Sequence, residues 1–184
     1  MEKEYDLGIP LCDGKKPFVP ARHLDLDKLL RLHPNWFIET LETSGDTFTA
    51  SLKDYVTDKT FSLAGRLETS SPDTVILEMT SGVVRRLHIR IGPKGLQALV
   101  IYQSTEPSKE EEETVLLWIR SIGQYLRLYI STTPNTLFFR LVMNRMLLKM
   151  NPSQRKISIM LIRITIVEMA VIVIILLGYF FVGR

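Results

Sequence analysis

The feature that most constrains this chain is an apolar run near its C-terminus, from Ile164 to Val182. Glu168 is the only charged residue among these 19 positions. At about 1.5 Å of rise per residue, a helix of this length spans roughly 28 Å, close to the hydrocarbon thickness of a bilayer. The run therefore predicts a membrane-spanning helix over 157–182. The alternative is a helix buried in the core of a soluble protein.

The charges beside this run predict its orientation. Lys149, Arg155, Lys156 and Arg163 precede the apolar run, whereas only Arg184 follows it. Because cytoplasmic flanks carry an excess of Lys and Arg, we expect the N-terminal domain to lie in the cytoplasm. The first residues are polar and predict no signal peptide. We expect a tail-anchored, single-pass membrane protein.

The net charge of +3 is unevenly distributed along the chain. Residues 1–136 contain 16 Lys/Arg and 19 Asp/Glu, whereas residues 137–184 contain 7 Lys/Arg and one acid. The basic excess belongs to the tail, where the lipid bilayer is the expected partner and nucleic acid is not. The single cysteine, Cys12, excludes an internal disulfide and fits a reducing compartment.

Residues 137–150 predict an amphipathic helix immediately before the anchor. Its basic residues recur at helical spacing, and we expect this helix to lie in the membrane interface. The alternative is that it packs on the core of the domain. A break at Asn151-Pro152-Ser153 predicts a hinge. The residues expected at the membrane interface are Arg140, Arg145, Lys149, Arg155 and Lys156.

Glu168 lies four residues inside the apolar run. A charge at the centre of a bilayer costs roughly 2.5–3.5 kcal/mol on insertion scales. Near the interface the carboxylate either stays hydrated or takes up a proton. The functional alternative is that Glu168 contacts another transmembrane subunit.

Residues 18–132 predict one soluble α+β domain, preceded by a loosely ordered segment at 1–17. A short helix is predicted over 24–32, with Asp25 or Asp27 as its cap and His33-Pro34 as its end. Six segments then alternate polar and apolar residues between turns, which is typical of an antiparallel meander. The predicted strands are 36–42, 47–55, 60–69, 74–81, 83–91 and 96–103.

A long amphipathic helix closes the domain after an acidic first turn, Glu110–Glu113, which suits the positive end of the helix dipole. It reads Glu113-Thr-Val-Leu-Leu-Trp-Ile-Arg-Ser-Ile-Gly-Gln-Tyr-Leu-Arg-Leu128. The order of short helix, six strands and long helix over 18–132 resembles the helix-grip fold of the START-like superfamily, which includes polyketide cyclase and lipid-transfer proteins. That family has two short helices after its first strand, whereas this sequence shows one.

The resemblance implies a curved sheet that grips the long helix, with a pocket between them for an apolar molecule such as a lipid, sterol, quinone or polyketide. Small residues on the strands can leave space for such a molecule. The alternative is that they pack tightly under the large residues of the helix. The residues expected at the pocket are Ala50, Gly65, Ala98, Trp118, Ile122 and Tyr125.

Arg86, His88 and Arg90 alternate along one strand and share one of its faces. They form a candidate site for the phosphate of a lipid headgroup or a nucleotide. The alternative is a solvent-facing row that pairs with acids such as Glu78 on a neighbouring strand.

The sequence contains no recognisable catalytic motif, and its three histidines lack the spacing of metal ligands. We therefore expect no catalytic residues, no metal and no cofactor. The function predicted is a membrane-tethered cytoplasmic binding protein for an apolar ligand. The alternative is a non-catalytic accessory or docking subunit of a membrane protein complex. An enzyme acting on a lipid-like substrate is a third possibility, and it lacks a visible acid–base pair.

Overall fold

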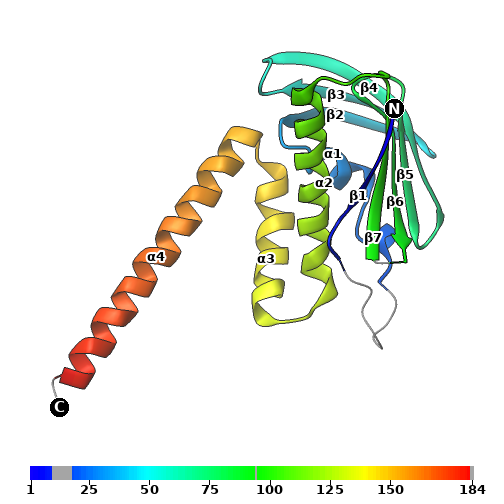
Figure 1. Ribbon diagram of the computed structural model, residues 1–184. Coiled ribbons are helices and arrows are strands. Elements are labelled where there is room, and N and C mark those ends of the chain that lie inside the picture. The colour runs from blue at the N-terminus through cyan, green and yellow to red at the C-terminus, as the bar shows by residue number, and fades with distance from the viewer. Residues whose placement is uncertain (10–17, 94, 183–184) are drawn as a thin grey trace.

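The computed structural model describes residues 1–9, 18–93 and 95–182. Its strands form one curved antiparallel sheet in the order β1-β7-β6-β5-β4-β3-β2 (Figure 1). Consecutive strands from β2 to β7 are neighbours, as the predicted meander requires. The strands are β1 Glu2–Asp6, β2 Trp36–Ser44, β3 Thr47–Asp54, β4 Lys59–Ser71, β5 Thr74–Met79, β6 Val84–Gly92 and β7 Gly95–Tyr102.

The helices lie before and after the meander. Two short ones, the 3-10 helix η1 (Pro20–Arg22) and α1 (Leu26–Arg31), precede β2, where the sequence predicts one. The long helix α2 (Lys109–Ile130) follows β7. The remaining elements are α3 (Pro134–Arg145), the 3-10 helix η2 (Leu147–Lys149) and α4 (Pro152–Val182).

The N-terminal strand β1 corrects the prediction that residues 1–17 are loosely ordered. Residues 2–6 pair with β7 in a continuous register from Glu2–Ile101 to Asp6–Gln97. The strand is mostly charged, so it shows little apolar alternation, and its pairing depends on the distant edge of β7. The sheet therefore has seven strands instead of about six. Residues 10–17 lie outside the described part of the chain.

The core lies between the concave side of the sheet and one face of α2. Trp118, Ile122 and Leu126 on α2 are buried, as are the inward-facing residues of the strands. The first turn of α2 is stabilised by a capping box, in which Ser108 and Glu111 each accept the other's backbone N–H. The predicted α+β class, with a curved antiparallel sheet and a long closing helix, is confirmed.

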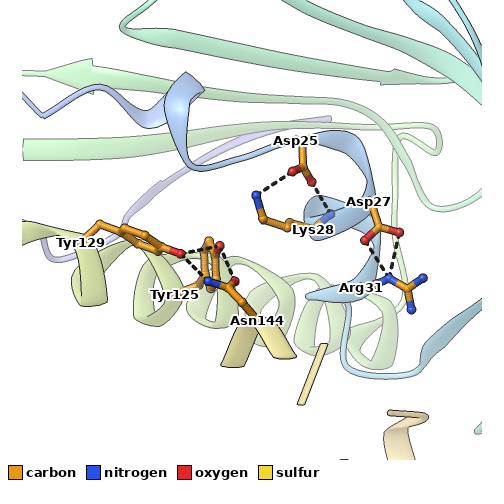
Figure 2. Close-up of polar contacts among 7 residues, drawn as sticks. All are labelled: Asp25, Asp27, Lys28, Arg31, Tyr125, Tyr129 and Asn144. Atoms are coloured by element: carbon orange, nitrogen blue, oxygen red, sulfur yellow. Dashed lines mark hydrogen bonds and ion pairs between the residues drawn. The ribbon is translucent and has the colours of Figure 1, made fainter. Parts of the chain in front are cut away.

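Helix α3 packs against α2 through a closed ring of three hydrogen bonds (Figure 2). The hydroxyl of Tyr125 donates to Asn144 Oδ1 at 3.0 Å, and Asn144 Nδ2 donates to the hydroxyl of Tyr129 at 2.8 Å. The two hydroxyls lie 2.9 Å apart. Because the proton of Tyr125 is used by Asn144, Tyr129 is the donor in this third bond. Burial and this bond raise the pKa of Tyr125 above its usual range.

The face of α3 that turns away from α2 is apolar and exposed. Leu137, Phe138 and Leu141 are 50%, 58% and 57% exposed. The helix is also shorter than the predicted segment 137–150, because it ends at Arg145 and the chain continues as η2. Helix α3 turns the polar side chains of Arg140 and Asn144 toward α2.

Helix α4 extends away from the domain (Figure 1). Over Pro152–Leu176 it is long and apolar enough to cross a membrane, and none of its most apolar stretch of 18 residues is buried by the rest of the protein. Asn151 caps its start, because Asn151 Oδ1 accepts the backbone N–H of Gln154 at 2.8 Å.

Candidate functional site

A cavity of about 400 Å³ opens between one end of the sheet and the N-terminal half of α2. Its walls come from the loop after α1, the start of β2, the β3–β4 turn, the β5–β6 turn and α2. The β3–β4 turn is held by Asp54, whose Oδ1 accepts the backbone N–H groups of Val56 at 2.7 Å and Thr57 at 3.1 Å. This volume lies within the range of small-molecule pockets, roughly 300–1,000 Å³.

One wall of this cavity is aromatic. The ring of His33 stacks on Trp36 with centroids 3.7 Å apart and planes 17° apart, and it meets Trp118 edge-on at 5.3 Å. Trp36 in turn packs edge-on against Phe61 at 5.7 Å. Trp118 is fixed because its Nε1 donates to the carbonyl of Leu29 at 2.9 Å, which ties α2 to α1.

His33 is the buried polar residue of this wall, with only 4% of its surface exposed. Its Nδ1 accepts the backbone N–H of Asn35 at 3.3 Å, so the neutral ring carries its proton on Nε2. Burial, and then the positive charge of Arg155, lower the pKa of His33 well below its usual value. His33 follows the end of α1, as predicted, and its side chain also lines the cavity, which was not expected.

Three of the polar residues that line the cavity have structural roles. Asp54 holds a turn, and Ser108 and Glu111 form the capping box of α2. Within the described residues, no group of three His, Cys, Asp or Glu side chains is placed to hold a metal ion. The arrangement can bury an apolar group against an aromatic wall and offer it the Nε2–H of His33 as a donor.

Among the residues predicted for the pocket, Trp118 alone lines this cavity. Ala50, Ala98 and Ile122 are packed in the core. Gly65 pairs with Phe48 on β3, and an added Cβ would lie 2.8 Å from that ring. Tyr125 lies about two turns further along the buried face of α2 than Trp118, where its hydroxyl contacts Asn144 on α3. The small strand residues thus follow the alternative of tight packing.

His33, Trp36 and Val84 also line the cavity, and the sequence did not predict them there. His33 lies in the loop after α1, and Trp36 is the first residue of β2. Two aromatic rings so close to this boundary are the one feature of the local sequence that could have indicated a pocket. Nothing in the local sequence predicts that this boundary lies opposite the start of α2.

The basic row on β6 faces solvent and is paired with acids. Arg86 forms an ion pair with Glu78 on β5, and Arg90 Nη2 lies 3.3 Å from Glu4 on β1. Partial burial, followed by the charges of Arg90 and Arg86, lowers the pKa of His88. This arrangement matches the solvent-facing alternative.

The residues predicted for the membrane interface separate into two groups. Arg140 points to the C-terminal end of α2, where its Nε and Nη2 donate to the carbonyls of Leu128 at 2.6 Å and Ser131 at 2.8 Å. Its guanidinium also lies 4.7 Å from the centre of the Tyr129 ring. The others lie near the junction between α3 and α4. Arg145, Lys149 and Lys156 are exposed there, whereas Arg155 is half-buried.

Glu168 is exposed on α4, four residues beyond Ile164, and it makes no ion pair within the described residues. The nearby hydroxyl of Thr165 donates to the carbonyl of Leu161 at 3.0 Å. Thr165 is therefore satisfied within its own helix.

A curved antiparallel sheet that grips a long helix, with a cavity between them, defines a helix-grip α+β fold. No family model and no curated protein matches this sequence. Solved structures similar to this chain include an AHSA1-like protein from Aeromonas hydrophila, with 9% identity, a TM-score of 0.40, and coverage of 70% of this chain and 92% of that one. They also include Chr148 from Cytophaga hutchinsonii, with 14% identity, a TM-score of 0.38, and coverage of 59% and 81%.

Proposed function

We propose that this protein is a membrane-tethered binding protein that holds an apolar ligand between its sheet and α2. The observation that carries the proposal is the aromatic-walled cavity beside Trp118, in a domain joined to an uncovered apolar helix. A concave pocket with aromatic and apolar lining is the usual form of a small-molecule site. Polar residues, among them Asp54, Glu110 and Glu111, also line this cavity. His33 offers one donor, which favours a ligand with a carbonyl or hydroxyl oxygen, such as a quinone-like or lipid-like molecule.

In this proposal α4 crosses the membrane once, and the domain lies on the cytoplasmic side. The uncovered apolar surface of α4 and the basic residues at its start support this orientation. A tether of this kind raises the local concentration of a ligand that partitions into the bilayer.

Native mass spectrometry on the full chain in a neutral detergent, followed by solvent extraction, tests the binding role. We expect a discrete apolar mass that is lost on denaturation. Thr114→Trp should prevent its retention, because Thr114 lines the cavity and a larger side chain fills it. Leu117→Trp is the matched control, since Leu117 is exposed on the same helix and lies outside the cavity.

Retention of the same mass by Thr114→Trp would contradict binding in this cavity. The absence of any bound mass, with no uptake when lipids and quinones are offered, would contradict the binding role as a whole.

The second candidate function is that of a docking subunit in a membrane protein complex. The exposed apolar face of α3 favours it, because contiguous apolar surface of this kind marks interaction sites. A photoreactive amino acid at Phe138 should then cross-link a discrete protein partner in the membrane. Cross-links to lipid alone would count against the docking role.

A further inference from the structure

A second hollow, of about 380 Å³, lies between α2, α3 and the first turns of α4. We name it the junction groove, and its lining is mostly apolar. Its lining includes Tyr125, Leu128, Phe139, Arg155, Lys156 and Ile159. It is separate from the cavity beside His33, because the two share no lining residue.

The charge of the junction groove is positive and uncompensated. Arg155 and Lys156 contribute two cations, and none of its lining residues is an acid. Neither cation forms an ion pair within the described part of the chain. Arg155 uses Nε and Nη1 to bind the carbonyls of Met150 and Arg31, whereas its buried Nη2 has no hydrogen-bond partner among the described residues.

The position of the groove indicates which anion it meets. Its mouth lies where α4 begins, and from Ile157 onward the large apolar side chains of α4 are exposed. Apolar lining and two cations therefore stand side by side at the start of a helix that is long enough to span a bilayer. An anionic phospholipid has the matching pair of features, because its headgroup is negative and its chains are apolar. Basic pockets beside membrane helices are known to bind anionic headgroups.

We propose that the junction groove binds one anionic phospholipid, with part of an acyl chain along Leu128, Phe139 and Ile159 and its phosphate beside Lys156 and Arg155. The inference rests on the membrane attachment in the proposed function, but it concerns a different cavity from the one beside His33. A bound lipid would cover the face shared by α2, α3 and α4, and would hold the domain close to the membrane surface.

The test is native mass spectrometry on the full chain in a neutral detergent, after mixing with equal amounts of dioleoyl phosphatidylglycerol and dioleoyl phosphatidylcholine. We expect one phosphatidylglycerol to be retained in preference to phosphatidylcholine. Lys156→Gln should lower its occupancy about five-fold, the value of one basic residue near an anionic surface. Arg163→Gln is the matched control, because it removes the same charge from α4 and does not line the groove.

Ser121→Trp supplies a second variant that fills the groove from α2. The hydroxyl of Ser121 bonds only to the carbonyl of Leu117 in its own helix, so its loss leaves no distant partner unsatisfied. This variant should lose the bound phosphatidylglycerol and keep any ligand held beside His33.

Equal retention of the two lipids would overturn the proposal, as would equal losses from Lys156→Gln and Arg163→Gln. Membrane attachment is checked separately by an alkaline wash of membranes that contain the full chain. A chain that stays in the washed membranes without retaining phosphatidylglycerol would refute the groove alone. A chain released by the wash would refute the attachment.

Discussion

The guanidinium of Arg155, near the start of α4, donates through Nη1 to the main-chain carbonyl of Arg31 at the end of α1. Arg31 reaches back, because its own Nη1 donates to the carbonyl of Leu148 in η2 at 3.3 Å. Its Nε is held by Asp27 at 2.8 Å (Figure 2). The two arginines thus connect α1 to the junction where the sequence predicts a hinge, and they link α4 to the loop that carries His33.

Arg155→Ala should loosen this junction. Hydrogen bonds from a charged donor contribute about 1.5–3 kcal/mol, so the free energy of local opening at residues 146–155 should fall by a similar amount. Hydrogen exchange on the full chain in detergent measures this change. Arg163→Ala, which removes a cation from the same helix, should leave exchange at the junction unaltered. Equal exchange in the two variants would show that the junction does not depend on Arg155.

Asn144→Leu should weaken the packing of α3 on α2. The change removes the acceptor of Tyr125 and the donor to Tyr129, and the two hydroxyls then have only each other. A buried polar group without its partner costs about 1–3 kcal/mol. We expect faster hydrogen exchange in α3, with little change in β2–β7. Arg145→Leu, an exposed neighbour on the same helix, is the control, and matching exchange in both variants would contradict the role of the ring.

Gly65→Ala should destabilise the sheet. A Cβ at this position would lie 2.1 Å from the carbonyl oxygen of Glu78 and 2.8 Å from the ring of Phe48. Because the nearest atom belongs to the backbone of β5, the strand itself must shift, and overpacking of this kind costs about 1–3 kcal/mol. Thermal unfolding measures the effect, and we expect a lower Tm. Ser62→Ala, at an exposed position of the same strand, should change the Tm little, and an unchanged Tm in Gly65→Ala would refute the clash.

The stability of the domain should fall as the pH drops below about 6.5, the usual pKa of an unfolded histidine. In that range the unfolded chain binds a proton at His33 and the folded chain does not, because burial lowers the folded pKa. The contribution is about 1.4 kcal/mol per pH unit at most. The full contribution of His33 is present well above pH 6.5, where its ring is neutral in both the folded and the unfolded state.

Denaturation of the full chain between pH 7.5 and 5 measures this slope. His33→Gln should flatten it, whereas His88→Gln should remove a smaller part, because His88 is only half-buried. Arg155 is the charged group that adds to the burial effect at His33. Identical slopes for the original protein and His33→Gln would contradict a neutral, buried His33.

The sequence predicts the element types well, since each depends on a local period. Alternation in segments such as Thr47–Asp54 predicts a strand with one buried face, and the spacing of Val115, Trp118 and Ile122 predicts the buried face of α2. The candidate site is predicted less well. Of its aromatic wall, Trp118 alone was expected at a pocket.

By itself, the sequence determined that the chain carries an α+β domain and one apolar helix long enough to span a bilayer, because composition and periodicity act within a single segment. Only the tertiary structure decided that β1 joins the edge of β7, that Arg140 binds carbonyls at the end of α2, and that His33 lines a cavity. These outcomes depend on which distant segments meet. Trp118 and Leu29, which fix the wall of that cavity, are 89 residues apart, and no local pattern encodes a contact over that separation.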